Sequence, residues 1–397
     1  MSNARELAIL GGTPAFAERL HVGRPNVGDR AALQMRIDTM LDRVWLSNDG
    51  PLLQEFEARL AELLGVRHCI AVCNGTVALQ IMAKACDLSG EVIMPSFTFV
   101  ATAHALEWQG VTPVFCDIDP RTHNMDPTKV EQLITDATTG ILGVHVWGRP
   151  CDVDALQEIA DRRGLVLAFD AAHALACTHR GRMLGNFGAA ECFSFHATKF
   201  FNTFEGGAIT TNDDEVATRC RLMRNFGFDG PDHVSSIGIN GKMTEVCAAM
   251  GLTNLDSLDD FIAVNIRNYE AYAESLGPIT GIELIQLPEG ERSNHQYVVV
   301  TVDEGRAGLS RNELQAVLTA ENILARRYFY PGCHAMVPYS LRELRVPLPA
   351  TEQLTEQALS LPTGTAVDPD DIRAICEVIA TALDSSARVR EARGAVS

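Results

Sequence analysis

The segment "FSFHATKFFNTFEGG", residues 193–207, places one lysine, Lys199, among five phenylalanines. A lysine side chain normally keeps its ammonium group in water, because burial removes the hydration that stabilises the charge. Two apolar runs, residues 190–195 and 206–211, flank Lys199 and are predicted to be β-strands. Lys199 is therefore expected to be half-buried beside a sheet, where it needs partners from other parts of the chain.

The composition is ordinary for a soluble globular protein, with 46% hydrophobic and 21% charged residues among 397. This length predicts two unequal domains or one large α/β unit. The 33 basic and 51 acidic residues give a net charge of −18, which argues against a general nucleic-acid binder. No stretch reaches the roughly 18 apolar residues of a membrane span. Eleven scattered cysteines favour reduced thiols in a cytoplasmic protein, and no metal site is predicted.

Strands and helices alternate over the first part of the chain. Helices are predicted at residues 51–65, 76–88, 101–110 and 153–164, where apolar residues recur at helical spacing. Short apolar runs predict strands at residues 68–73, 91–95, 111–119, 140–148, 165–170, 190–195 and 206–211. Such alternation indicates βαβ units, and hence a mostly parallel sheet covered by helices on both faces.

The pattern changes in the last third of the chain. A long helical stretch covers residues 245–276, a strand is predicted at 295–302, and helices are predicted at 310–322 and 368–383. The tail, residues 385–397, is expected to be frayed. These elements predict a smaller α/β domain on a connecting helix. The expected division is an N-terminal segment at 1–25, a large domain at 26–250 and a smaller domain at 251–397.

A turn before one predicted helix is suited to binding phosphate. Gly75 follows Asn74 at the end of a strand, and Thr76 opens the helix whose free N–H groups point back at the turn. Thr76 could instead simply cap this helix. Ser194, five residues before Lys199, offers a hydroxyl to the same phosphate, although a strand serine is usually unremarkable.

A carboxylate and two rings are expected at the same edge of the sheet. Asp170 ends a hydrophobic strand, where α/β sheets usually place ligand-contacting residues, and its charge needs a cationic partner. The alternative is an aspartate that starts a turn. His173 could hold Asp170, lie near a ring face, or be a satisfied core residue. Phe99 follows another strand, and it contacts either a ligand or the core.

Together these groups match the needs of pyridoxal phosphate (PLP). Its aldehyde needs an amine, its pyridine nitrogen an acid, its ring a stacking partner and its phosphate a cup of donors. Burial lowers the pKa of Lys199, so that more of the side chain is a nucleophilic amine. A Schiff base with PLP would remove the free ammonium altogether, which explains the position of Lys199.

The chain resembles the DegT/StrS-type nucleotide-sugar aminotransferases, which are fold-type-I PLP enzymes. The resemblance runs over nearly the whole length and rests on motifs in the family's order: "SNDGPLLQEFE", "CNGTVALQ", "MPSFTFVATAHAL", "VHVWGRPCDVDAL", "FDAAHALA", "SFHATKFFNTFEGGAITTND", "INGKMTEVCAAMGL" and "YFYPGCHAMVPY". It implies a large, mostly parallel sheet of the seven-stranded type and a smaller C-terminal α/β domain.

The resemblance also implies roles for single residues. Lys199 forms the Schiff base and Asp170 pairs with the pyridinium nitrogen. The other implied cofactor contacts are Phe99 on the ring, Gly75, Thr76 and Ser194 on the phosphate, and His173, which stands where many relatives have glutamine. Asn240, in "GING", resembles the asparagine that reaches the phosphate from the neighbouring subunit. A homodimer with shared active sites is therefore expected. Without the family match, Asn240 would be read as a turn residue.

The implied substrate is a nucleotide-linked ketosugar, specifically dTDP-4-keto-6-deoxyglucose, aminated with L-glutamate in deoxysugar or antibiotic biosynthesis. The segment 325–339 is the one expected to face it. Candidates for diphosphate or nucleotide contacts are Arg326 and Arg327, and candidates for sugar hydroxyls are Tyr330 and His334. Each has an ordinary alternative: a surface cation for the arginines, and core packing or a turn contact for the other two.

Several other functions stay open. The ketone could be a 3-ketosugar or a cyclitol such as scyllo-inosose, because those relatives share every cofactor motif. Family members that dehydrate a sugar carry histidine in place of Lys199, so the lysine favours transamination. A carbon–carbon PLP enzyme would need different proton-handling groups. A silent PLP-binding regulator would not turn over, and a cofactor-free binding protein would purify colourless.

Overall fold

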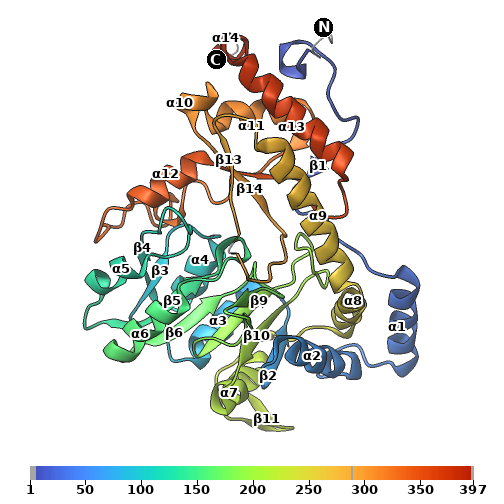
Figure 1. Ribbon diagram of the computed structural model, residues 1–397. Coiled ribbons are helices and arrows are strands. Elements are labelled where there is room, and N and C mark those ends of the chain that lie inside the picture. The colour runs from blue at the N-terminus through green and yellow to red at the C-terminus, as the bar shows by residue number, and fades with distance from the viewer. Residues whose placement is uncertain (1–5, 288, 395–397) are drawn as a thin grey trace.

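The computed structural model describes residues 6–287 and 289–394, which form two main sheets surrounded by helices (Figure 1). The larger sheet has seven strands in the order β2-β10-β9-β6-β5-β3-β4. Strand β10 runs antiparallel to β2 and β9, and the other neighbours are parallel. The prediction of a large, mostly parallel sheet is confirmed. The strands are β2 His68–Val72, β3 Glu91–Pro95, β4 Thr112–Cys116, β5 Thr138–Val144, β6 Val166–Asp170, β9 Ala190–Ser194 and β10 Gly207–Thr211.

Helices cover both faces of this sheet, because successive strand side chains point to opposite sides. Val92 and Met94 of β3 pack in a core with α3, α4 and α7, whereas Ile93 packs in another with α6. Helices α2 and α8 cover the β2 end of that second face, where they pack on Cys69 and Phe193. The helices are α1 Arg30–Arg43, α2 Pro51–Leu64, α3 Gly75–Ala85, α4 Ala101–Glu107, α5 Pro127–Val130, α6 Val153–Arg163, α7 Asp214–Arg224 and α8 Glu245–Asp256.

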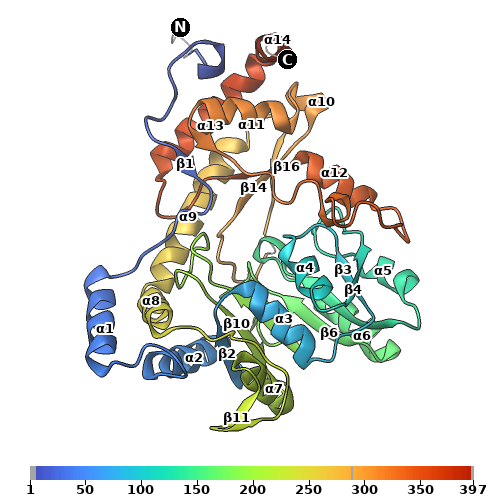
Figure 2. The same ribbon diagram turned by 180° about the vertical axis from the view of Figure 1, so that it is seen from behind.

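The last third of the chain builds a three-stranded antiparallel sheet in the order β13-β14-β16. Figure 2 shows this sheet beside the long helix α9, away from the layer of the large sheet. Its core gathers Leu276, Val300, Leu318 and Ile375 with Leu7 of the N-terminal segment. The elements are β13 Ile282–Leu284, β14 Val298–Val302, β16 Ala358–Leu361, α9 Leu258–Leu276, α10 Glu304–Ala307, α11 Arg311–Ala320, α12 Pro349–Gln357, α13 Pro369–Asp384 and α14 Ser386–Gly394. The exact domain boundaries stay a prediction.

Short elements complete the fold. Strand β1 pairs with β15 in parallel, which joins the N-terminal segment to the last third of the chain, and β7–β8 and β11–β12 are small antiparallel ribbons. Their bounds are β1 Leu20–His21, β7 Thr178–His179, β8 Arg182–Met183, β11 Phe228–Gly230, β12 His233–Val234 and β15 Ile323–Leu324, with 3₁₀ turns at Ala8–Leu10, Glu131–Leu133, Val146–Gly148 and Cys333–Ala335.

Two details of the sequence prediction are wrong. The stretch 245–276 is broken at Ser257, whose non-helical ψ of 9° separates α8 from α9. The tail is helical over residues 386–394, because Val389 is fully buried in the same core as Leu7 and Arg388 pairs with Glu6 at 2.9 Å. The remaining tail residues, 395–397, lie outside the described residues, as do residues 1–5 of the expected N-terminal segment.

Candidate active site

A cavity of about 660 Å³ lies at the carboxyl ends of the parallel strands of the large sheet. Strands β2, β6 and β9 end beside it, at Val72, Asp170 and Ser194. Ligand sites in such sheets lie at this edge, because the loops there are free to carry functional side chains. The predicted residues that line the cavity are Gly75, Thr76, Phe99, Asp170, His173, Ser194, Lys199 and Arg326.

Lys199 is half-buried in the loop that joins β9 to β10. Its Nζ donates a hydrogen bond of 3.2 Å to the hydroxyl of Tyr297 and lies 5.6 Å from the centre of that ring. Burial lowers the pKa of Lys199 to about 8, and the negative charge of Asp170 opposes this shift. An amine with this pKa is partly unprotonated near neutral pH, as a nucleophile or a proton-transfer group requires.

Asp170 ends β6 with a carboxylate that is only 5% exposed. Oδ2 accepts a hydrogen bond of 2.8 Å from the hydroxyl of Thr102, and Oδ1 accepts one of 3.0 Å from the backbone N–H of Ala172. Burial raises the pKa of Asp170, while these two donors and Lys199 act in the opposite direction. The carboxylate of Asp170 is therefore buried, and Lys199 provides the nearby cation that the sequence predicted.

The first turn of α3 offers backbone N–H groups to the cavity. Asn74 is the cap of this helix, since its side chain accepts a hydrogen bond of 2.8 Å from the N–H of Val77. The alternative that Thr76 is the capping residue is therefore wrong. A Cβ on Gly75 would lie 2.8 Å from the Cβ of Ser194, so only glycine lets the helix start so close to β9. The first amides of a helix lack intrahelical partners and attract anions.

The rings of the cavity differ in exposure. Phe99 is 57% exposed, which is unusual for a phenylalanine and leaves a free apolar face beside the cavity. His173 is buried: its Nδ1 accepts a hydrogen bond of 3.3 Å from the N–H of Trp147, and its ring lies 4.6 Å from that of Tyr297. Burial lowers the pKa of His173 well below its usual value, so the ring is neutral. His173 packs among rings, as one of its predicted alternatives states.

Three of the predicted substrate contacts do not line this cavity. His334 is buried and its Nδ1 lies 2.7 Å from the hydroxyl of Ser96, which satisfies it inside the protein. The guanidinium of Arg327 stacks 4.8 Å from the ring centre of Tyr330, and it donates to Asn312 at 3.0 Å. His334 is thus bonded to Ser96, and Arg327 and Tyr330 contact each other outside the cavity, whereas Arg326 lines it.

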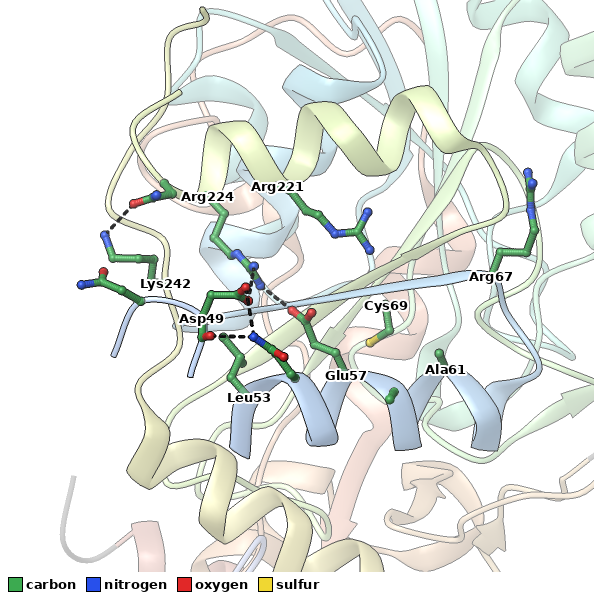
Figure 3. Close-up of a pocket in the computed structure, with 13 residues that line it drawn as sticks. Asp49, Leu53, Glu57, Ala61, Arg67, Cys69, Arg221, Arg224 and Lys242 are labelled. Carbon is green, nitrogen blue, oxygen red and sulfur yellow. Dashed lines mark hydrogen bonds and ion pairs between the residues drawn. The ribbon is translucent and has the colours of Figure 1, made fainter. Parts of the chain in front are cut away.

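A second cavity, of about 490 Å³, lies between α2 and α7 (Figure 3), and Asn240 pairs with one of the residues that line it. Its backbone pairs with that of Asn225, which lines this second cavity and accepts a hydrogen bond of 3.1 Å from Lys242. Arg224 forms an ion pair with Glu57, but basic side chains outnumber acidic ones in the wall of this cavity. Asn240 itself is exposed and does not line the larger cavity of its own chain.

Sequence reasoning missed several residues of the larger cavity. Tyr297 holds Lys199 and Thr102 holds Asp170, while Tyr328, Phe329 and Glu205 add to the wall. Thr102 lies inside a motif that was recognised, so its position after a strand was an available signal. Tyr297 lies in the predicted strand 295–302 and in the segment "SNHQYVVV", which resembles the 4-aminotransferases, but nothing local to its sequence indicates a contact with Lys199.

A sheet with this strand order, carrying a lysine and a buried carboxylate on one cavity at its carboxyl edge, belongs to the fold-type-I PLP-dependent transferases. Residues 29–380 match the model of the DegT/DnrJ/EryC1/StrS aminotransferase family. The chain belongs to that family and is a sugar aminotransferase.

Individual relatives agree. A dTDP-4-amino-4,6-dideoxy-D-glucose transaminase from Shigella dysenteriae is 40% identical over 296 residues, 73% of this chain and 80% of its own length. A GDP-perosamine synthase from Caulobacter vibrioides is 37% identical, covering 84% and 90% of the two chains. The crystal structure of DesI in the presence of its TDP-sugar product is similar with a TM-score of 0.93, at 50% identity over 97% of this chain and 99% of that one.

The cavity suits the cofactor on which this family depends. It combines a partly neutral amine, a buried carboxylate, an exposed ring and the free N–H groups at the start of a helix, which match the aldehyde, pyridine nitrogen, ring and phosphate of PLP. Within the described residues there is no group of three or more histidine, cysteine, aspartate or glutamate side chains arranged to hold a metal. Nor does that part of the chain contain a helix with the length and apolar character needed to cross a membrane.

Proposed function

We propose that this protein is a PLP-dependent aminotransferase that converts a nucleotide-linked 4-keto-6-deoxysugar, specifically dTDP-4-keto-6-deoxyglucose, to the 4-amino sugar with L-glutamate as donor. The observation that carries the proposal is that Lys199 and Asp170 line one cavity, close enough for the charge of Asp170 to act on the pKa of Lys199. The choice of sugar is supported by the 50% identity to DesI, which was crystallised with a TDP-sugar product, and by the Shigella dysenteriae transaminase.

In this proposal the residues of the cavity divide the work. PLP, when bound, supplies a ring that withdraws electrons from the carbon bearing the amino group. Lys199 binds the cofactor in the resting enzyme. It then takes a proton from the carbon of glutamate that bears the amino group, and it later delivers a proton to the keto carbon of the sugar. Asp170 holds a proton at the pyridine nitrogen, because its buried negative charge stabilises the cation there.

The remaining contacts orient the cofactor. The N–H groups of Gly75 and Thr76 and the hydroxyl of Ser194 bind the phosphate at the start of α3. Phe99 packs on one face of the ring, and neutral His173 lies in the wall of the cavity without adding charge. Arg326, which lines the cavity, binds the diphosphate of the sugar nucleotide.

We further infer that the functional unit is a cytoplasmic homodimer in which Asn240 completes the phosphate site of the partner. Asn240 is exposed, and so are apolar side chains near it: Ile237 is 87% exposed, Ile239 41%, and Phe226, whose N–H donates to the carbonyl oxygen of Ile239, 44%. Exposed apolar groups gathered in this way are typical of a protein–protein interface. A second copy of the chain would cover them.

The substrate is tested by offering the purified enzyme, PLP and glutamate to a set of ketosugars, and measuring the release of 2-oxoglutarate. The set contains dTDP-4-keto-6-deoxyglucose, the matching GDP-linked 4-keto sugar, the dTDP-linked 3-keto sugar and free scyllo-inosose. Turnover is expected to be fastest with the first. The GDP sugar is the specific competitor, because GDP-perosamine synthases are among the similar proteins. Turnover of only a 3-keto sugar or the cyclitol would overturn the 4-amination proposal.

A further inference from the structure

Tyr297 connects the two halves of the fold at the lysine. It lies one residue before β14, in the smaller sheet, and is separated from Lys199 by 98 residues. Its hydroxyl nevertheless accepts a hydrogen bond of 3.2 Å from the Nζ of Lys199, which belongs to a loop of the large sheet. The sequence identifies Lys199 as a candidate catalytic residue, but it does not identify Tyr297 as its partner.

The ring of Tyr297 is held in place by other rings. It lies 4.6 Å from the ring of His173, 5.6 Å from that of Trp147, and 6.1 Å from that of Tyr328 at an angle of 89°. Burial raises the pKa of Tyr297, so its phenol stays protonated at neutral and mildly alkaline pH. The hydroxyl is therefore a fixed, neutral group that can both donate and accept.

The other polar groups near Lys199 already have partners. The carboxylate of Asp170 accepts hydrogen bonds from Thr102 and Ala172, and the Nδ1 of His173 accepts one from Trp147. The hydroxyl of Tyr297 is the group that accepts a hydrogen bond from the Nζ of Lys199, and a buried amine left unsatisfied is costly.

Building on the proposed function, we propose that Tyr297 is a positioning residue whose hydroxyl holds the amine of Lys199 whenever that amine is not bonded to the cofactor. Transamination frees the lysine in every half-reaction, because the amino group of the substrate takes its place on the cofactor. The phenol accepts from the ammonium form of Lys199 and donates to its neutral form. Both forms are thereby kept at one place, from which the proton is transferred.

The charged state of Lys199 gives a test that does not depend on turnover. Losing the hydroxyl removes an acceptor from the ammonium, and hydrogen bonds to a charged group are about twice as strong as neutral ones. The pKa of Lys199 is therefore expected to fall further in Tyr297→Phe. The titratable and charged groups that surround Lys199, and that stay unchanged in this variant, are Asp170, His173, His196, Glu205, Arg326 and Tyr328.

The experiment uses the full chain loaded directly with pyridoxamine phosphate, in which Lys199 carries no bond to the cofactor. Acetic anhydride labels neutral amines, and the labelling of Lys199 is followed against pH by mass spectrometry of its peptide. In the wild type the midpoint is expected below the usual value of 10.5, because burial lowers the pKa of Lys199. In Tyr297→Phe it should be lower, so that labelling at pH 7 rises roughly 3- to 10-fold, while kcat falls by roughly 10-fold or more because the amine is less well placed.

A matched control removes a tyrosine hydroxyl elsewhere. Tyr269 of α9 does not line the cavity, and its hydroxyl donates a hydrogen bond of 2.9 Å to the carbonyl oxygen of Ile285, so Tyr269→Phe should change neither the midpoint nor kcat. An unchanged midpoint in Tyr297→Phe would overturn the inference even if activity fell. Failure to bind pyridoxamine phosphate, or to transfer the amine of glutamate to any ketosugar, would instead refute the proposed function and say nothing against the contact itself.

Discussion

The hydroxyl of Thr102 donates a hydrogen bond of 2.8 Å to Oδ2 of Asp170, so that helix α4 holds the carboxylate at the end of β6. The same hydroxyl lies 2.9 Å from that of Thr98 and 3.0 Å from the carbonyl oxygen of Phe99. This network links the ring of Phe99 to the carboxylate through the backbone. Thr98, Phe99 and Thr102 all lie in the motif "MPSFTFVATAHAL", and this network gives them a structural role in holding Asp170.

Thr102→Val is expected to reduce kcat about 10-fold, because a hydrogen bond to a charged acceptor contributes about 1.5–3 kcal/mol. Valine keeps the shape of threonine but leaves Oδ2 of Asp170 without its side-chain donor. The measurement is kcat together with the dissociation constant of PLP. Thr218→Val, at an exposed threonine that bonds only to its own helix, is the control. Wild-type values for both constants would remove Thr102 from the support of Asp170.

Lys199→Ala is expected to bind PLP or pyridoxamine phosphate without a covalent bond and to be almost inactive. Positioned acid–base groups of this kind contribute ~10²- to 10⁴-fold to the rate. Borohydride reduction of the wild type with PLP should label one peptide, the one that contains Lys199. Lys129→Ala, which removes a lysine of the short helix α5, serves as the control. Labelling of any other lysine would show that the assignment is wrong.

The lowered pKa of Lys199 predicts a pH dependence of cofactor uptake. Its ordinary value is 10.5, and burial lowers it to about 8, so the amine becomes neutral in the folded protein as the pH rises through 8. Only the neutral amine attacks the PLP aldehyde. The rate of PLP incorporation into the cofactor-free enzyme, followed by absorbance, should therefore rise between pH 7 and 9 with a midpoint near 8. A midpoint near 10.5 would contradict the burial of the amine.

Asp170→Asn is expected to keep the cofactor but lose most turnover, by about 100-fold or more, because electrostatic stabilisation of the transition state usually contributes most to catalysis. Asparagine fills the same space without the charge that keeps the pyridine nitrogen protonated. Turnover and PLP content are measured on the same preparation. Asp152→Asn, at the cap of α6 where asparagine caps equally well, is the control. A near-normal rate would exclude Asp170 from the mechanism.

The sequence predicted the strands of the large sheet and the residues at their ends, because both depend on local patterns. Asp170 and Gly75 follow short apolar runs, and the carboxyl ends of parallel strands meet at one edge. The position of Tyr297 could not be predicted in this way, since its contact with Lys199 depends on how the smaller sheet packs against the larger. Local sequence patterns therefore predict the strands and the residues at their ends, but they do not predict contacts that arise from long-range packing.

The structure differs from the sequence expectation in segment 325–339 and in the tail for the same reason, since both depend on packing that the local sequence does not reveal. A histidine that faces a ligand and one that is satisfied by a serine look alike in sequence, and His334 is the second kind. Arg327 and Tyr330 stack on each other, which the cation–π attraction between them favours over exposure in the cavity. The tail looks polar enough to fray, yet Val389 is buried in the same core as Leu7 and fixes it.

The shared active site of the proposed dimer is tested by mixing two inactive variants. Lys199→Ala retains Asn240, and Asn240→Ala retains Lys199, so a hybrid dimer contains one whole site if the asparagine acts on the partner. Random mixing in equal amounts makes half of the dimers hybrids, each with one of two sites intact. Activity should therefore recover to about a quarter of the wild-type value per total protein.

The matched control mixes Lys199→Ala with Asp170→Asn, which alter groups that line the same cavity of one chain. No hybrid of these two variants has a site with both groups intact, so no recovery is expected above the residual rate of Asp170→Asn. Exchange of subunits is verified in both mixtures by co-purification of an untagged variant with a tagged one. If the Lys199 and Asn240 mixture stays inactive while exchange is complete, Asn240 is a turn residue of its own chain, held by Asn225, and the site is not shared.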